Sequence, residues 1–133
     1  MKLKHVAIVC RSEETCDRFY RDLLGLSKTG GKTVPADLAQ QIFNVDRPYR
    51  IINYADERLH FEIFLDPTAA YDDRKAVHIC LAVPDPDLLC VRAEALGVAV
   101  QRIAAAGRQL TFIRDLDGNL FEIKPDTPPS AAP

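Results

Sequence analysis

The chain repeats one local pattern twice, and this repeat limits its fold more than any other feature. In the first copy the strand-like run "HVAIVC" is followed by the helix-like run "EETCDRFYRDLLG". In the second copy the strand-like run "HICLAV" is followed by the helix-like run "PDPDLLCVRAEALG". His5 lies 20 residues before Gly25, and His78 lies 19 residues before Gly97. Each glycine suits the residue that follows a helix. Two copies are too few for a solenoid, so the sequence predicts two related halves.

Composition narrows the class of protein. The 133 residues suit one domain or two small fused halves, and 47% of them are hydrophobic. A formal net charge of -2 gives no reason to expect binding to nucleic acid or to an anionic membrane. The apolar runs are too short to span a membrane, and no signal peptide is recognisable. The four cysteines form no CxxC pair, so we expect free thiols and a cytoplasmic protein.

Each half reads as a strand, a helix and then a small run of antiparallel strands, which predicts an α+β fold. The later strands are expected at "YRIINYA", "RLHFEIFL", "VAVQRIAA", "RQLTFIRD" and "NLFEIKP". Thr29 to Pro48 is expected to be a longer connection with a short helix at "PADLAQQIF". The predicted halves are residues 1–66 and 67–126, and the proline-rich residues 127–133 are expected to be a flexible tail.

Ionisable residues recur at matching positions of the predicted strands. Strand alternation places His5, Glu62, His78 and Glu122 on faces whose uncharged companions are Ala7, Val9, Phe64, Cys80, Ala82 and Leu120. Those companions indicate sheltered faces, whereas the opposite faces supply the bulk that packs on the helices. A sheltered carboxylate must be paired, protonated or bound to a metal. Two histidines and two glutamates suit Zn²⁺, Ni²⁺ or Co²⁺ and disfavour Ca²⁺.

The sequence also resembles a known superfamily. "HVAIVCRSEETCDRFYRDLLGL" is similar to the opening of vicinal-oxygen-chelate proteins, "VHICLAV" to their central strand and "FIRDLDGNLFEIKP" to their closing strand pair. This superfamily includes glyoxalase I, methylmalonyl-CoA epimerase, fosfomycin-resistance and bleomycin-resistance proteins, and extradiol dioxygenases. The similarity covers roughly Lys4 to Pro125. It implies two tandem βαβββ modules that form an open, cup-shaped mixed sheet.

The resemblance also implies a site and a reaction. By position the metal ligands are His5, Glu62, His78 and Glu122, and a glutamate at the second position resembles glyoxalase I more than the epimerases. The implied activity is that of a lyase or isomerase that converts a small carbonyl or thioester substrate through a metal-stabilised enediolate. Glu122 is the first choice for the catalytic base, and Glu62 is the second. Mn and Fe are further options for the metal.

Four other residues are expected to line the cavity: His60, Phe64, Cys80 and Leu120. The expected partner is a small-molecule substrate, and the resemblance implies a homodimer. The arginine that glyoxalase I usually carries shortly after its first ligand is absent, because Ala7 and Val9 stand there. This difference weakens the case for a glutathione-linked substrate.

Three other functions remain open at this point. An extradiol dioxygenase would hold Fe²⁺ with two histidines and one glutamate, leaving Glu62 as a surplus ligand. A binding module of the bleomycin-resistance type would hold a ligand between aromatic walls without a metal. A thiol transferase resembling fosfomycin-resistance proteins would use two histidines, one glutamate and Mn²⁺.

Overall fold

The computed structural model describes residues 1–74 and 76–127, and the chain divides into two compact units, Met1–Ala70 and Tyr71–Pro133. The first unit contains β1 (Val6–Cys10), α1 (Glu13–Cys16), η1 (Asp17–Leu23), β2 (Ser27–Val34), α2 (Ala36–Phe43), β3 (Tyr49–Ala55) and β4 (His60–Leu65). The second contains β5 (His78–Val83), α3 (Pro86–Ala95), β6 (Val100–Ala105), β7 (Arg108–Arg114) and β8 (Leu120–Pro125). Residues 128–133 of the expected tail lie outside the described part.

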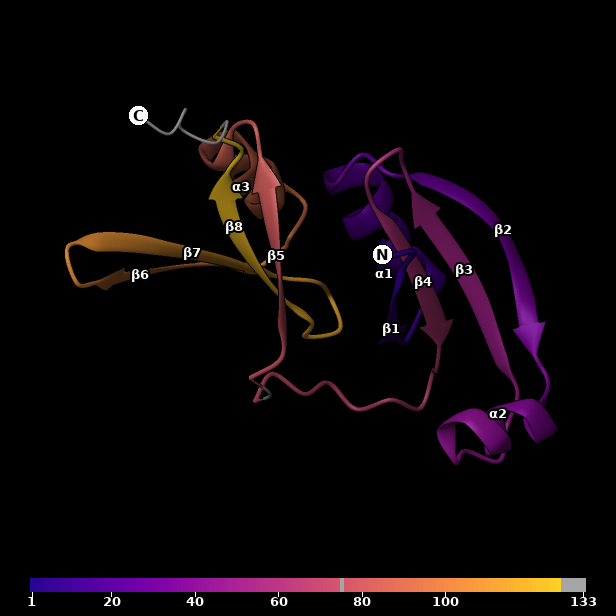
Figure 1. Cartoon of the computed structure of the whole chain (residues 1–133). Coiled ribbons are helices and arrows are strands. Elements are labelled where there is room, and N and C mark those ends of the chain that lie inside the picture. Colours follow the sequence, from indigo (N-terminus) through magenta and orange to yellow (C-terminus); the bar gives the residue numbers. More distant parts are fainter. Residues whose placement is uncertain (75, 128–133) are drawn as a thin grey trace. The chain divides into compact units, whose positions relative to one another are not determined.

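Each unit is built on an open four-stranded mixed sheet (Figure 1). The strand order is β1-β4-β3-β2 in the first unit and β5-β8-β7-β6 in the second. The pairs β1–β4 and β5–β8 are parallel, and the other neighbours are antiparallel. The prediction of an α+β fold with two tandem βαβββ modules is therefore confirmed.

The first helical run begins at a side-chain cap and changes pitch on the way. The Ser12 hydroxyl accepts a hydrogen bond from the Thr15 amide at 3.3 Å, which satisfies one of the free amides at the start of α1. From Asp17 the chain continues as the π-helical turn η1, in which the Leu24 amide donates to Phe19 O at 3.0 Å. Gly25 then adopts a φ of 75°, as predicted for the residue that ends this helix.

The core of the first unit lies between η1 and one face of its sheet. Tyr20 on η1 is fully buried, and its ring lies 5.5 Å from that of Tyr54 on β3 and 5.4 Å from that of Phe61 on β4. Aromatic pairs at such spacings add to the stability that area burial provides. Phe61 and Ile63 thus supply bulk to the helix, as the alternation of β4 predicts.

The second unit repeats this arrangement with α3. The Asp85 carboxylate accepts a hydrogen bond from the Leu88 amide at 3.0 Å, and Pro86 occupies the first turn, where its missing N–H costs nothing. Gly97 ends the helix with a φ of 74°. The buried hydrophobic residues of this unit come from the helix, the following turn and one face of the sheet: Leu81, Leu89, Cys90, Ala93, Val98, Ile113, Phe121 and Ile123.

The connection expected from Thr29 to Pro48 contains a strand that the sequence did not predict. β2 pairs antiparallel with β3, and its register shifts between Thr29 and Lys32 at a β-bulge. Most of β2 is exposed, so the strand has no apolar alternation to reveal it. Gly31 lies so close to β3 that a Cβ there would collide with the carbonyl oxygen of Ile51. The short helix expected in this stretch is present as α2.

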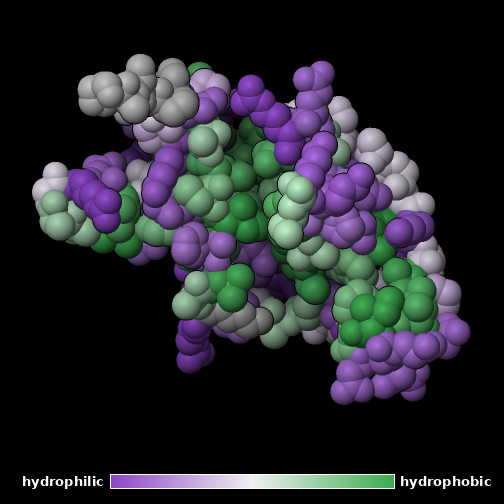
Figure 2. All heavy atoms as spheres, in the orientation of Figure 1, coloured by the Kyte–Doolittle hydropathy of each residue, from purple (hydrophilic) through white to green (hydrophobic). Residues whose placement is uncertain are grey.

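α2 packs against one end of the sheet on the face opposite η1. Its buried Ala39 belongs to a cluster with Tyr49 and Ile51 of β3 and Phe64 of β4. Its more exposed apolar residues are Leu38, Ile42 and Phe43. Figure 2 shows a hydrophobic surface at the lower right, where Figure 1 places α2. α2 therefore covers only part of the face that carries the predicted ligands.

Candidate functional site

The parallel pairing of β1 and β4 gathers the ionisable residues of the first unit on one face. Ala7 is paired with Glu62 and Val9 with Phe64, so alternate residues of the two strands share this face. We call it the histidine face of the first unit, consisting of His5, Ala7, Val9, His60, Glu62 and Phe64. α2 packs at its Phe64 end.

His5 and Glu62 meet on this face. His5 Nε2 lies 3.7 Å from Glu62 Oε2. The imidazole is 43% exposed, whereas the carboxylate is only 14% exposed. The sequence predicted sheltered side chains, and within the first unit the carboxylate is the more sheltered of the two. Of the described residues, His5 is the one whose side-chain nitrogen the structure brings within 4 Å of the Glu62 carboxylate.

The second unit holds the same pair on the equivalent strands. His78 Nε2 lies 3.5 Å from Glu122 Oε2, and their side chains are 42% and 16% exposed. Lys124 Nζ lies 3.5 Å from the other carboxylate oxygen of Glu122, a contact the sequence analysis did not anticipate. Cys80 is paired in register with Glu122, and burial together with the Glu122 charge raises the pKa of its thiol.

The geometry of each pair suits two ligands of one divalent ion. Ligand atoms about 2.1 Å from an ion lie roughly 3.0 Å apart at octahedral angles and roughly 3.4 Å apart at tetrahedral angles. The observed distances of 3.7 and 3.5 Å therefore need to close by roughly 0.1–0.3 Å for a tetrahedral ion and roughly 0.5–0.7 Å for an octahedral ion. Imidazole nitrogen with carboxylate oxygen is also a donor set that divalent transition metals accept.

His60 lies beside the first pair but is held by a different residue. Its Nε2 lies 2.8 Å from Asn53 Oδ1 on β3, and its ring centroid is 5.6 Å from that of His5. Asn53 is itself paired in register with Glu62. His60 and Asn53 thus form a second polar pair on the histidine face of the first unit.

The two units differ at the positions that surround the matching pairs. In the second unit Leu120 stands where the first unit has His60, because each lies two residues before the glutamate. Phe112 is paired with Glu122 where the first unit pairs Asn53 with Glu62. The ring of Phe112 lies 6.2 Å from that of His78. The two units therefore carry the same residue types at the His–Glu pairs but different residue types around these pairs.

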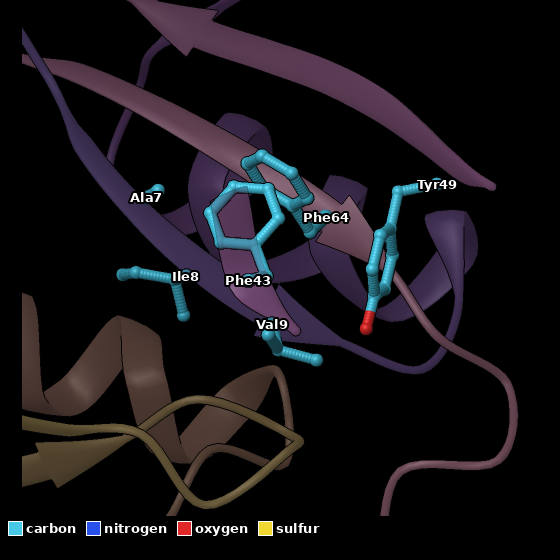
Figure 3. Close-up of a pocket in the computed structure, with 6 residues that line it drawn as sticks. All are labelled: Ala7, Ile8, Val9, Phe43, Tyr49 and Phe64. Atoms are coloured by element: carbon cyan, nitrogen blue, oxygen red, sulfur yellow. The ribbon is translucent and has the colours of Figure 1, made fainter. Parts of the chain in front are cut away.

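An apolar pocket of about 230 Å³ opens on the first unit (Figure 3). It is lined by Ala7, Ile8, Val9, Phe43, Tyr49 and Phe64. The Phe64 ring lies 5.4 Å from that of Phe43 and 5.5 Å from that of Tyr49, so three rings from α2, β3 and β4 form its wall. A cavity of about 150 Å³ is enough to bind benzene, so this pocket has room for a small ring.

The lining of this pocket includes one of the four residues that the sequence analysis expected to line a cavity. Phe64 lines the pocket, whereas His60, Cys80 and Leu120 do not belong to its lining. Phe43 and Tyr49 were not expected here, because they flank a connection whose path the sequence does not reveal. Strand alternation within "YRIINYA" would have placed Asn53 on one face with Tyr49 and Ile51. Only the register of β3 against β4 shows that Asn53 lies beside Glu62 on this face.

The chain belongs to the Glyoxalase/Bleomycin resistance protein/Dioxygenase superfamily, whose family model matches residues 2–123. A lactoylglutathione lyase from Pseudomonas putida is 44% identical over 59 residues, which are 43% of this chain and 34% of that protein. The chain thus matches about a third of the length of this curated relative.

Solved structures share the fold at low sequence identity. A glyoxalase family protein from Enterococcus faecalis has a TM-score of 0.68 at 18% identity, covering 92% of this chain and 95% of that chain. The fosfomycin resistance protein FosX from Listeria monocytogenes, as a variant in complex with Mn(II) and 1S,2S-dihydroxypropylphosphonic acid, has a TM-score of 0.69 at 18% identity, covering 95% and 93%. Among residues 1–74 and 76–127, no helix has the length and apolarity that crossing a membrane requires.

Proposed function

We propose that this protein is a metal-dependent lyase or isomerase of the glyoxalase type that acts on a small carbonyl or thioester compound. His5, Glu62, His78 and Glu122 supply the ligands of one divalent ion. The observation that supports this proposal is the recurrence of one His–Glu contact, at 3.7 and 3.5 Å, at equivalent positions of both units. A chance strand histidine would not be expected to find the same partner twice.

The similarity to a lactoylglutathione lyase supports this class of reaction. When bound, the ion acts as a Lewis acid that stabilises negative charge on substrate oxygens. Glu122 serves as the base that takes a proton from the carbon next to the carbonyl, and Glu62 is the second choice. Lys124, 3.5 Å from Glu122 Oε1, keeps a positive charge beside this carboxylate.

The pocket of the first unit receives the apolar substituent of the substrate. Val9 and Phe64 line it and lie two residues along their strands from Ala7 and Glu62, about 7 Å away at the usual rise of a strand. A methyl, alkyl or phenyl group on the reacting molecule can therefore reach it.

The metal and the assembly belong to the same proposal. Histidine nitrogen with carboxylate oxygen favours Zn²⁺, Ni²⁺ or Co²⁺, with Mn²⁺ and Fe²⁺ as further options. We infer a homodimer, as expected for the superfamily the sequence resembles.

Metal analysis combined with isotope exchange tests the proposal. Protein purified without added metal is supplemented with Ni²⁺, Co²⁺ or Zn²⁺ and desalted, and its metal content is measured. We expect bound metal in the wild type and a loss of at least about tenfold in affinity for Glu122→Gln. Glu94→Gln on α3 is the matched control, because Glu94 is an exposed glutamate paired with Arg102. Deuterium uptake at the α-carbon of added hydroxy-carbonyl compounds then reports the proton abstraction.

A metal-free binding module is the second candidate, and the aromatic pocket favours it. The rings of Phe43, Tyr49 and Phe64 form the kind of apolar wall that holds small molecules. Absence of bound metal after supplementation, together with binding of an aromatic compound, would establish this function instead. Consumption of O₂ without deuterium uptake would indicate a dioxygenase.

A further inference from the structure

A chain of two hydrogen bonds fixes His60 on the histidine face of the first unit. Asn53 Nδ2 donates to Gly30 O at 3.1 Å, and Asn53 Oδ1 lies 2.8 Å from His60 Nε2. Gly30 belongs to the bulged part of β2, so the strand that the sequence did not predict anchors these two hydrogen bonds. The three residues come from β2, β3 and β4 in that order across the sheet.

These contacts determine the tautomer of the His60 ring. Only the nitrogen of the Asn53 amide can donate to the carbonyl oxygen of Gly30, so the amide oxygen must face His60. That oxygen accepts, and His60 Nε2 therefore carries the proton. In a neutral imidazole the other nitrogen is then a bare acceptor. Nδ1 lies on the far side of the ring from Asn53, and the described residues provide His60 with no second hydrogen bond.

The second unit has neither of the two side chains of this arrangement. Leu120 replaces His60, and Phe112 takes the register position of Asn53 beside the glutamate. Nothing in the packing of a repeated module requires a histidine at this position, because its apolar counterpart occupies the same place in the second sheet. The His60–Asn53 pair is therefore an addition to the first unit rather than part of the shared fold.

We propose that His60 is a substrate-binding residue whose Nδ1 accepts a hydrogen bond from a hydroxyl group of the substrate. This inference rests on the proposed function, since it places the substrate beside Glu62. It narrows the substrate to a class: a 2-hydroxy carbonyl or 2-hydroxy carboxyl compound whose hydroxyl group reaches His60.

The order of residues along β4 limits where a compound of this class can lie. His60, Glu62 and Phe64 are alternate residues of one strand, so they line one face at intervals of about 7 Å. The face thus presents an acceptor at His60, then the carboxylate of Glu62, and then the aromatic pocket at Phe64. Because His60 and Phe64 lie two such intervals apart, a small 2-hydroxy compound whose hydroxyl reaches His60 lies between His60 and Glu62.

The tautomer can be measured without any metal or ligand. The ¹⁵N chemical shifts of the His60 ring, recorded at about pH 8.5 where model imidazoles are neutral, distinguish protonated from bare nitrogen. We expect proton on Nε2 and none on Nδ1 in the wild type, and a mixture of tautomers in Asn53→Leu. Gln109→Leu on the exposed part of β7 is the control and should leave the spectrum of His60 unchanged. A proton on Nδ1 of the wild type would overturn the proposal.

Substrate binding is tested with mandelate and phenylacetate, which differ by one hydroxyl. Titrations use the full chain, with and without saturating Ni²⁺, for the wild type and for His60→Leu. The variant reproduces the residue that the second unit carries at Leu120. We expect the ratio of mandelate to phenylacetate affinity to fall roughly 3- to 10-fold in the variant, the effect of one neutral hydrogen bond. The affinity for Ni²⁺ itself should not change.

The outcomes separate this inference from the proposed function. Equal weakening of both ligands would show that His60 only supports the fold, and an unchanged ratio would show that it does not touch the hydroxyl. Failure of the wild type to bind mandelate would contradict the substrate class. Absence of Ni²⁺ binding in the wild type would refute the proposed function, while a hydroxyl preference that depends on His60 without metal would still support the inference.

Discussion

His78 Nε2 lies 3.5 Å from Glu122 Oε2, and the two residues lie on the parallel neighbours β5 and β8. The first unit repeats this contact through His5 and Glu62 beside the parallel neighbours β1 and β4. The likeness follows from topology, because in both modules the first strand adds in parallel to the last. A histidine at the start of one strand and a glutamate in the middle of the other then meet without help from the helices.

Loss of a pair should affect ligand binding far more than stability. In metal-free protein, Glu62→Gln and Glu122→Gln should change the free energy of unfolding by less than about 1 kcal/mol, because their histidine partners are substantially exposed. Urea denaturation followed by circular dichroism measures this. A loss of several kcal/mol would mean that the pairs are structural and would remove the reason to regard them as a site.

The aromatic pocket should recognise apolar groups through Phe43. Because Phe43 is 45% exposed, Phe43→Ala should cost little stability while reducing the preference for benzohydroxamate over acetohydroxamate by roughly 3- to 10-fold. Leu88→Ala, an exposed leucine on α3, is the control. Calorimetric titration of the two hydroxamates into metal-loaded protein gives the ratio. An unchanged ratio in Phe43→Ala would exclude this pocket as the binding place of the phenyl group.

At the bulge of β2, adding a methyl group should cost little stability at Gly30 and considerably more at Gly31. Gly31→Ala forces a Cβ into the carbonyl oxygen of Ile51, so we expect a loss of about 1–3 kcal/mol. Gly30→Ala meets no atom within 4 Å and should be much milder. Thermal denaturation of both variants measures the difference. Equal stability of the two would show that β2 does not approach β3 as described.

The carboxylate of Asp17 should make stability depend on pH in the acid range. Burial opposes its charge, but the Tyr54 hydroxyl at 2.7 Å and the Lys28 ammonium at 3.0 Å outweigh that effect and lower the pKa of Asp17. A lowered pKa in the folded state stabilises the protein above the unfolded pKa of about 3.9, and this contribution is lost as the pH falls further.

Asp17→Asn should therefore lower the free energy of unfolding by about 1–3 kcal/mol at neutral pH. The gap to the wild type should shrink below about pH 4, because the unfolded wild type then takes up a proton at Asp17 while the folded wild type still carries the charge. Denaturant titrations at neutral and at acid pH compare the two proteins. A gap that stays constant with pH would show that the charge of Asp17 has no part in this stabilisation.

The sequence predicted elements well where burial imposes a period. β1, β4, β5 and β8 alternate buried and less buried residues, and this alternation correctly placed Phe61, Ile63, Phe121 and Ile123 against the helices. The helix ends were found at Gly25 and Gly97 because positive φ angles favour glycine there. Local patterns of this kind need no knowledge of distant contacts.

The sequence failed where a feature depends on pairing between distant segments. β2 is an exposed edge strand with two adjacent glycines, so no periodicity marks it. The pocket needs α2 to fold back on β3 and β4, and the role of Asn53 needs both the carbonyl of Gly30 and the ring of His60. These features depend on strand register and tertiary packing. The local pattern of a single segment does not predict either of them.

The central proposal is that the two His–Glu pairs supply the ligands of one divalent ion. Equilibrium titration with Co²⁺, followed by visible absorption and metal analysis, should give a stoichiometry of one bound ion for every two His–Glu pairs. Four single variants, His5→Ala, Glu62→Gln, His78→Ala and Glu122→Gln, should each weaken binding at least about tenfold, while Glu94→Gln should not. Full affinity in the variants of either pair, or no binding by the wild type, would contradict the claim.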